Sequence, residues 1–355
     1  MADGKWQMAN GRWQMADGRW QMADGRWQMA DGRWQMADGR WQMADGRWQS
    51  ENRESPFVPQ SRNYGGTGRE PGTTPRLDAL AKCPDRSRVS RRASQPCALT
   101  IAGSDSGGGA GAQMDLKVFA SLGVHGTSAI TCLTAQNPDR VSGVQAARPE
   151  MVAAQIEAVF DGFSPKAVKT GMLYSAPIIR VVAGALSALP GRPALVVDPV
   201  MIATSGAALL KPSARRALET GLIPLAALVT PNLDEAEALL GRSISDVDGL
   251  REAAREIRKR FGCAALVKGG HLQGSKVAVD AYCDGRNELA LEAPFERGVS
   301  THGTGCSYSA AIAGHLALGS GLKRAVQEAK RHVTESIRQS VKSGGQFVLN
   351  SFWSG

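Results

Sequence analysis

The sequence has few of the residues that mark metal-binding, secreted or membrane proteins. Its 355 residues include only five histidines and six scattered cysteines with no Cys-x-x-Cys pair, so a zinc site is not indicated. No run of 18 apolar residues occurs, and the first fifty residues hold no apolar signal-peptide core. Scattered cysteines of this kind are typical of a reduced compartment. We therefore expect a cytoplasmic protein without membrane contact.

Positive charge is present but unevenly distributed. The formal net charge is +9, of which residues 1–97 carry +5 and residues 98–355 carry +4. In the second part charges of both signs are interspersed, so no basic patch is indicated. The basic pI therefore does not predict a nucleic-acid partner.

Aromatic residues are scarce, and seven of the eight tryptophans lie in the first 49 residues. Residues 1–49 are seven tandem copies of Met-Ala-Asp-Gly-(Lys/Arg)-Trp-Gln, with one Asp-to-Asn change at Asn10. Each copy contains a glycine and lacks the apolar pair of a coiled coil, and seven residues are too few for a solenoid unit. We interpret this segment as a low-complexity, largely disordered expansion, or as sequence upstream of the true start; a Trp-rich adhesive arm is the alternative. Residues 50–97, rich in Arg, Ser, Pro and Gly, have the composition of a disordered linker.

Residues 98–355 have the pattern of an α/β domain. Strands are predicted at Ala98–Ala102, Thr127–Thr134, Lys166–Lys169, Ala194–Asp198, Ala227–Thr230 and Ala264–Lys268. Helices are predicted at Gln113–Leu122, Glu150–Phe160, Ala176–Leu189, Leu233–Leu240, Asp246–Phe261 and Cys306–Leu318. This alternation predicts a mostly parallel sheet with helices on both faces. Lys276–Cys283 and Glu288–Leu291 have no helix between them and predict a hairpin near one edge of the sheet.

Two glycine-rich segments follow predicted strands. Gly103–Gly111 lets backbone N–H groups approach a ligand, but it lacks the acidic partner of a dinucleotide site and the lysine of a P-loop. It indicates either a small-ligand site or a structural turn. In Thr301–Ser307, Gly303, Thr304 and Gly305 precede a helix and form a cradle for developing phosphoryl charge. Cys306 lies in the same positive field, so we expect its thiol pKa to fall from about 8.5 and the thiol to accept a proton.

Further polar residues stand at strand ends, where ligands collect in such folds. The Gln136 amide matches the edge of an aminopyrimidine or is a plain strand-end hydrogen-bonder. Asp198 could order Mg²⁺ waters or cap a loop, and Lys268 could bind phosphate or be solvated. Asn232 and Glu235 have the spacing of a capping box at a helix start.

Together these segments resemble the hydroxymethylpyrimidine/phosphomethylpyrimidine kinases of thiamin synthesis, within the ribokinase-like superfamily. The resemblance extends from Ala98 to about Phe352. Its motifs are Ala102–Lys117, Ala135-Gln136-Asn137, Lys169–Leu173, Val197–Met201, Thr230-Pro231-Asn232, Lys268–His271 and Thr301–Cys306. Cys306 stands where the superfamily usually has aspartate.

The resemblance implies a ribokinase-like fold, two successive phosphorylations of one pyrimidine with ATP and Mg²⁺, and a homodimer. It places Gly103, Ala110, Asp115, Gln136, Met172 and Val200 in the pyrimidine pocket, although Met172 alone would be assigned to the core. It assigns Asp198, Asn232, Glu235 and Lys268 to the ATP phosphates, with Asp198 and Glu235 near Mg²⁺ through water. It makes Gly303, Thr304 and Gly305 the anion hole and Cys306 the base.

Two departures from the family pattern stand out. Tyr308 occupies a position where a smaller or aliphatic residue is usual, and the ending Ser343–Phe352 matches the family's ending only loosely. Two other functions remain open at this point: a vitamin B6 kinase, and a catalytically silent pyrimidine-binding regulatory module. The silent module would predict the loss of Cys306, Lys268 or the glycines, all of which are present.

Overall fold

The structure is a computed structural model with two compact units, residues 1–86 and residues 87–355. It describes residues 94–201, 212–270, 272, 277–296, 298–299 and 302–353, and five short strands between residues 20 and 49. None of the helices in these ranges is long and apolar enough to cross a membrane.

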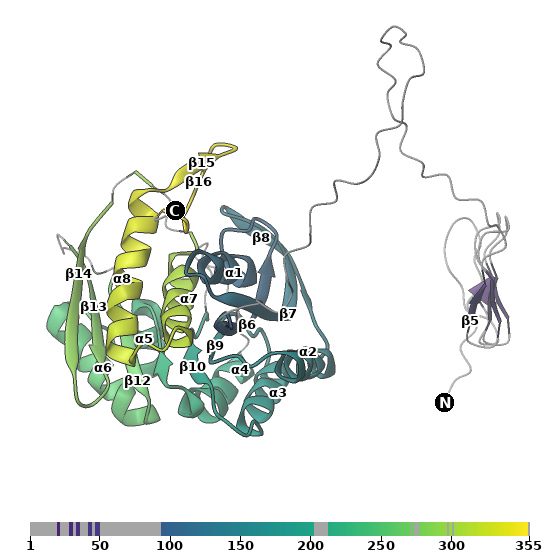
Figure 1. Cartoon of the computed structure of the whole chain (residues 1–355), viewed down its shortest axis with the longest axis horizontal. Helices are drawn as coiled ribbons and strands as arrows, with labels where there is room; N and C mark the ends of the chain where they lie inside the picture. The colour runs from purple at the N-terminus through teal and green to yellow at the C-terminus, as the bar shows by residue number, and fades with distance from the viewer. Residues whose placement is uncertain are drawn as a thin grey trace, which may run out of the picture. The chain divides into compact units, whose positions relative to one another are not determined.

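A nine-stranded sheet forms the centre of the second unit (Figure 1). Its strands are β6 (Cys97–Asp105), β7 (His125–Asn137), β8 (Arg140–Ala146), β9 (Ala167–Thr170), β10 (Ala194–Val197), β11 (Leu228–Val229), β12 (Ala264–Lys268), β13 (Val277–Cys283) and β14 (Glu288–Pro294). Their order is β14-β13-β12-β11-β10-β9-β6-β7-β8. The six strands from β12 to β7 in this order pair in parallel, and antiparallel strands close both edges. The predictions of a mostly parallel sheet and an edge hairpin are therefore confirmed.

Helices cover both faces of the sheet (Figure 1). They are α1 (Gly111–Ser121), α2 (Pro149–Gly162), α3 (Ala176–Ser187), α4 (Pro212–Ala217), α5 (Leu233–Leu240), α6 (Val247–Phe261), α7 (Thr304–Ala317) and α8 (Leu322–Arg338). Apolar side chains of α1, α7 and α8 form one buried cluster with the sheet, and those of α2, α3, α5 and α6 form another. Two short helical turns, Leu218–Leu222 and Ile223–Leu225, follow α4 and join the second cluster.

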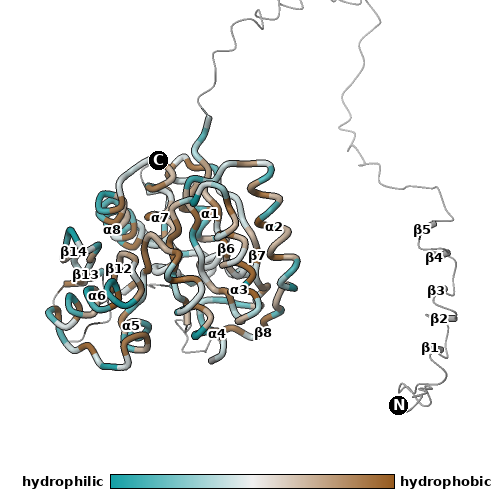
Figure 2. Tube along the Cα trace, turned by 90° about the horizontal axis from the view of Figure 1, so that it is seen from below, coloured by the Kyte–Doolittle hydropathy of each residue, from teal (hydrophilic) through white to brown (hydrophobic). Residues whose placement is uncertain are grey.

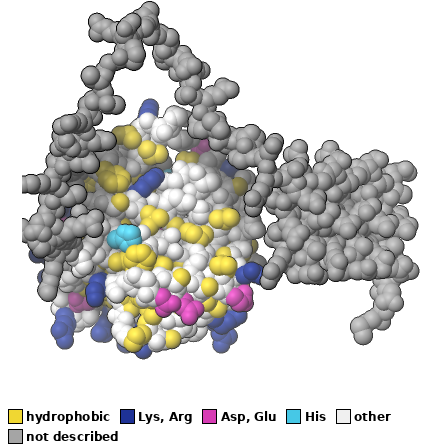
Figure 3. Space-filling model, turned by 45° about the vertical axis from the view of Figure 1, so that its right-hand side comes forward, with side chains coloured by type: hydrophobic (Ala, Val, Ile, Leu, Met, Phe, Trp, Pro, Cys, Tyr) yellow, Lys and Arg dark blue, Asp and Glu magenta, His cyan; other side chains and the backbone are white. Residues whose placement is uncertain are grey.

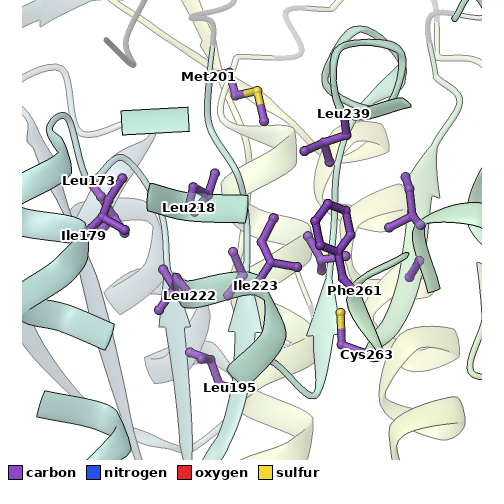
Figure 4. Packing of buried hydrophobic residues seen from close by; sticks show 14 of the residues in the cluster. Leu173, Ile179, Leu195, Met201, Leu218, Leu222, Ile223, Leu239, Phe261 and Cys263 are labelled. Carbon is purple, nitrogen blue, oxygen red and sulfur yellow. The ribbon is translucent and has the colours of Figure 1, made fainter. Parts of the chain in front are cut away.

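The strands are hydrophobic throughout because both faces are buried. In β10, Leu195 and Val197 pack into the cluster of α2 to α6, while Val196 between them packs toward α7 and α8. Figure 4 shows Leu195 near Leu222 and Ile223 in the cluster that includes α2 to α6. In Figure 2 the hydrophobic colour gathers on the inner segments, and α6 and α8 carry hydrophilic stretches. On the face seen in Figure 3, hydrophobic side chains occur in small groups on a mostly uncharged surface, and most charged side chains lie toward its lower part.

Several elements were not predicted from the sequence. They are β8, α4, α8, and the small antiparallel pair β15 (Val341–Ser343) and β16 (Gln346–Val348). The residues of β8 are mostly exposed, so this strand has no buried apolar run to reveal it. Helix α8 is rich in charge and buries only one stripe, which includes Val326 and Val333. The sequence predicted that the α/β domain begins at residue 98, and the first strand of the sheet begins one residue earlier, at Cys97.

The repeat segment contains short strands that the sequence did not lead us to expect. They are β1 (Trp20–Gln21), β2 (Gln28–Ala30), β3 (Arg33–Gln35), β4 (Gln42–Ala44) and β5 (Arg47–Gln49), which pair antiparallel in chain order. The remaining residues of 1–93, on which the predicted disorder and linker mostly fall, lie outside the described residues.

Candidate active site

A cavity of about 330 Å³ opens where the parallel strands end. Eleven of the fourteen predicted site residues line it: Ala110, Gln136, Asp198, Val200, Asn232, Glu235, Lys268, Gly303, Thr304, Gly305 and Cys306. They come from segments almost 200 residues apart in the chain, and the fold brings them to one wall because the carboxyl ends of parallel strands share an edge.

The turn before α7 is built around Gly303. Gly303 has φ +81°, and a Cβ atom there would collide with the Gly109 carbonyl oxygen, so a glycine is required for two reasons. The Ser307 N–H donates to the Gly303 carbonyl at 2.8 Å, which starts the helix. The first N–H groups of an α-helix make no bond within the helix, and this helix begins on the cavity wall. The turn therefore has the geometry of an anion hole.

Cys306 is half-buried on this wall, and its thiol pKa differs from our expectation. Burial raises the pKa to about 11, the positive charge of Lys169 opposes this, and the carboxylates of Asp115 and Asp198 add to it. A hydrogen bond from the Gly111 N–H lowers the pKa slightly. The expected fall toward neutrality is wrong for the protein without ligands, because loss of hydration outweighs the positive field of the helix start.

Lys268 and Asp198 form an ion pair on the cavity wall beneath the anion-hole turn. The Lys268 Nζ lies 2.9 Å from Asp198 Oδ1, and Ser309 of α7 donates its hydroxyl to Asp198 Oδ2 at 3.0 Å. A Cβ at Gly305 would lie 3.3 Å from the Lys268 Nζ, so this glycine lets the ammonium approach the helix start. Burial acts to lower the pKa of Lys268, but the carboxylates of Asp198 and Glu235 raise it overall, and the side chain is charged.

Asn232 and Glu235 form the capping box that their spacing predicts. Asn232 Oδ1 accepts from the Glu235 N–H at 2.8 Å, and Glu235 Oε2 accepts from the Asn232 N–H at 2.9 Å. The other carboxylate oxygen of Glu235 accepts from the Met201 N–H at 3.1 Å. Burial raises the pKa of Glu235, with a further contribution from the Asp198 charge. Asn232 and Glu235 therefore form a helix cap, and their place on the cavity wall also allows the predicted position near the ATP phosphates.

The donor set of this wall suits Mg²⁺ held through water. Within the described residues no group of three or more His, Cys, Asp or Glu could hold a metal directly. Mg²⁺ keeps several waters and commonly binds through one or two carboxylates and substrate phosphates. Asp198 and Glu235 both line the cavity and supply two carboxylates.

The glycine-rich loop binds an internal anion, the carboxylate of Asp105. Asp105 accepts from the backbone N–H groups of Gly107 at 2.8 Å, Gly109 at 3.1 Å and Ala110 at 2.8 Å, and its carbonyl accepts from Gly108. The expectation that these N–H groups approach a ligand is therefore wrong for Gly107 to Ala110. Burial acts to raise the pKa of Asp105, but bonds from His302, Gly107 and Ala110 lower it overall, so the carboxylate is ionised.

Gln136 and Val200 line the cavity from two different segments of the chain. The Gln136 Oε1 accepts from the Thr134 hydroxyl at 3.3 Å, and its backbone is tied to the Ser106 hydroxyl on the glycine-rich loop. These bonds hold Gln136 against the glycine-rich loop. Val200 has φ +39°, which is a strained conformation for a β-branched residue. Such strain is commonly kept at functional sites.

Three residues predicted in the pyrimidine pocket lie behind the wall. Asp115 is fully buried, and both its oxygens lie 2.9 Å from the Nζ of Lys169. A Cβ at Gly103 would lie 3.5 Å from the Met172 Sδ, so these two residues pack together. Their contact with substrate stays a prediction.

Sequence reasoning missed the second half of the cavity. Its apolar surface comes from Ala278, Ala293, Pro294, Phe295, Val333 and Ile337, of which the last two belong to the unpredicted α8. The Asp280 carboxylate lies 2.7 Å from the Lys330 Nζ and accepts from the Gly269 N–H at 3.1 Å. Burial, with the nearby charge of Asp280, raises the pKa of Tyr308 well above its usual value. Two sequence signals pointed to this region, the predicted edge hairpin that carries Ala278 and Asp280 and the unusual Tyr308.

Known proteins with this arrangement identify the family. The family model for phosphomethylpyrimidine kinase matches residues 105–350. The chain belongs to this family. It is 46% identical to the hydroxymethylpyrimidine/phosphomethylpyrimidine kinase of Synechococcus elongatus, over 73% of this chain and 98% of that protein. It is 48% identical to the corresponding kinase of Rhizobium meliloti, over 68% of this chain and 90% of that protein.

Solved structures of similar proteins have the same fold. The phosphomethylpyrimidine kinase of Clostridium difficile matches with a TM-score of 0.61 and 42% identity, over 68% of this chain and all of that one. An ADP complex of Bacillus subtilis pyridoxal kinase matches with a TM-score of 0.66 and 35% identity, over 73% of this chain and 98% of that one. The fold is thus ribokinase-like, and the enzyme family is one of ATP-dependent phosphotransferases.

Proposed function

We propose that this enzyme phosphorylates 4-amino-5-hydroxymethyl-2-methylpyrimidine and then phosphorylates the resulting monophosphate in the same cavity, in thiamin biosynthesis. The observation that carries the proposal is the meeting of the Gly303–Cys306 turn, the Lys268–Asp198 pair and Gln136 on one wall. A neutral heteroaromatic ring fits beside the Gln136 amide, and anionic groups fit beside the helix start and Lys268. The family to which the chain belongs carries out this reaction.

The residues of the wall account for the chemistry in the proposal. Phosphoryl transfer needs mainly positioning and stabilisation of charge on the transferred group. The N-terminus of α7 and the charged Lys268 stabilise that charge, and Gly305 lets the two approach each other. Cys306, on the same wall, accepts the proton of the attacking hydroxyl. In a loose transition state, the bond to the leaving group breaks before much of the bond to the attacking oxygen has formed. The attacking oxygen therefore loses its proton late, and a weakly ionised thiol suffices.

ATP and Mg²⁺ complete the site in this proposal. Asp198 and Glu235 would hold Mg²⁺ through water, with Asn232 beside the ATP phosphates. When bound, Mg²⁺ neutralises phosphate charge and orients the transferred group. The protein would act in the cytoplasm as a homodimer.

A coupled assay of ADP release tests the proposal. Hydroxymethylpyrimidine, its monophosphate and pyridoxal are each supplied with Mg-ATP, and we expect turnover with both pyrimidines. Efficient phosphorylation of pyridoxal, with no turnover of either pyrimidine, would contradict the proposal. The Cys306→Ala variant should lose most of its turnover and still bind the pyrimidine in calorimetry. An undiminished rate would refute the base role of the thiol.

A vitamin B6 kinase is the second candidate. The similar solved structures include the pyridoxal kinase of Staphylococcus aureus bound to pyridoxal, at 31% identity and a TM-score of 0.67. The pyrimidine kinases that match are more similar in sequence, at 41–48% identity. We therefore rank the pyrimidine first, and the same assay separates the two.

A further inference from the structure

The glycine-rich loop Gly107–Gly111 contacts the Gly303–Cys306 turn, and the carboxylate of Asp105 lies at this contact. Asp105 ends β6, and its side chain is 3% exposed. Its Oδ2 accepts from Gly109 and Ala110 and lies 3.4 Å from the Nε2 of His302, which directly precedes Gly303. One carboxylate therefore contacts both the loop beside the predicted substrate position and the turn that forms the anion hole.

The N–H groups of the loop are fully accounted for. Those of Gly107 to Ala110 donate to Asp105, and that of Gly111 donates to the Cys306 thiol. A segment of this kind would otherwise attract an external anion. Because Asp105 already supplies the anion, phosphate is directed to the other glycine-rich turn, which lies against it through the contact of Gly109 with Gly303.

We propose that Asp105 is the positioning residue of this active site: it serves as the resident anion of the Gly107–Gly111 loop and, through His302, sets the position of the Gly303–Cys306 turn. It does not line the cavity and touches no reacting atom. Its role is to hold the acceptor side and the phosphoryl side at a fixed separation. The proposal rests on the proposed phosphoryl transfer at this cavity, and it holds for either ring system as acceptor.

The Asp105→Asn variant tests this role. An amide keeps one acceptor oxygen but cannot accept from Gly107, Gly109, Ala110 and His302 together, so both glycine segments should shift. Since a displacement of about 1 Å at a reacting centre costs on the order of 10²-fold in rate, we expect kcat to fall by about that factor. The Kd for ADP should change much less, because Lys268 and Asn232 are untouched.

Asp284 provides a matched control. Its carboxylate accepts from the backbone N–H groups of Arg286 and Asn287 in the β13–β14 turn, and it does not line the cavity. Asp284→Asn likewise removes a carboxylate that stabilises a turn by accepting from backbone N–H groups. We expect its melting temperature to fall by less than that of Asp105→Asn, because Asp284 is more exposed, and its kcat to stay within about twofold of the wild type. Equal losses of kcat in the two variants would overturn the proposal.

His302 supplies a second, independent test. His302→Gln keeps a side-chain N–H donor toward Asp105 and should retain most of the activity, whereas His302→Ala should lose kcat as Asp105→Asn does. If the two residues act as one unit, the double variant Asp105→Asn/His302→Ala should be no slower than the worse single variant. Additive losses, or a kcat of Asp105→Asn close to that of the wild type, would contradict the proposal. If circular dichroism shows that Asp105→Asn does not fold, the kcat values of the two His302 variants test the proposal by themselves.

All rates are measured relative to the wild type with whichever acceptor it phosphorylates best. A failure of the pyrimidine assignment would appear in the wild type itself. A failure of the Asp105 proposal would appear only in the ratios between variants.

Discussion

The thiol of Cys306 determines how the reaction depends on pH. Its pKa of about 11 means that the thiolate is the minor form at neutral pH, and that its fraction rises tenfold per pH unit below the pKa. If the thiolate accepts the proton, kcat/KM should rise by about tenfold per unit from pH 7 to 9 without a plateau, because kcat/KM reports the free enzyme. A pH–rate profile with the pyrimidine checks this. A plateau below pH 8 would mean that a different group is the base.

Lys169 and Asp115 form an ion pair that is fully buried beneath the catalytic wall. Both side chains are 0% exposed, and the Thr100 hydroxyl donates to Asp115 at 2.5 Å. Breaking such a pair leaves one charge without compensation and costs about 3–5 kcal/mol, whereas replacing both partners by apolar residues is often neutral. We expect Lys169→Met to lower the free energy of unfolding by about that amount and Lys169→Met/Asp115→Leu to recover much of it. Urea denaturation measures both, and an equal loss in the double variant would contradict this account.

The roles of some site residues could be predicted from the sequence, and those of others could not. Glycines before a helix and polar residues at strand ends follow local rules, so Gly303, Lys268 and Asn232 could be placed in advance and do line the cavity. Asp105 and Lys169 could not, because their roles depend on partners far away in the chain. Asp105 meets His302 across 197 positions, and Lys169 has the local pattern of an ordinary strand residue. The pKa of Cys306 was missed because burial cannot be read from the helix start alone.

At the scale of elements, two helix caps of the same type should behave differently. Asn232 caps α5 and lies on the cavity wall, while Asp246 caps α6 through the Gly249 N–H at 2.7 Å and does not line it. Replacing either cap by alanine should cost about 1 kcal/mol of stability. Only Asn232→Ala should also raise the KM for Mg-ATP. Thermal unfolding and steady-state kinetics test this pair, and a similar rise in KM for Asp246→Ala would contradict the role of Asn232.

The elements that could be predicted are those with buried apolar runs. The parallel strands read as continuous hydrophobic segments because helices cover both faces, and their order along the chain gave the fold class. Strand β8 is exposed and helix α8 is highly charged, so neither has that signal. The omission of α8 also hid Lys330 and Val333 on the cavity wall. The missing helix therefore explains part of the missing half of the site, and the other part comes from residues of β13 and β14 whose place on the cavity wall was not predicted.

At the scale of the whole molecule, the catalytic unit should not need the repeat segment. The described cavity-lining residues lie between Ala110 and Ile337, and the family match covers residues 105–350. A chain that begins at Ser87, the first residue of the second compact unit, should fold and turn over within about twofold of the full chain. Circular dichroism and the ADP-release assay check this. A tenfold loss of kcat in a folded, shortened chain would show that the first unit contributes to catalysis.

The central claim concerns two phosphoryl transfers to one pyrimidine at one cavity. Mass spectrometry of a single reaction that starts from hydroxymethylpyrimidine, Mg-ATP and the full chain tests it most directly. The account predicts that the monophosphate appears first and is then converted to the diphosphate. It also predicts that Cys306→Ala slows the first step most, because the phosphate oxygen that attacks in the second step is already largely ionised near neutral pH. Conversion of pyridoxal but of no pyrimidine, or an undiminished first step in Cys306→Ala, would contradict it.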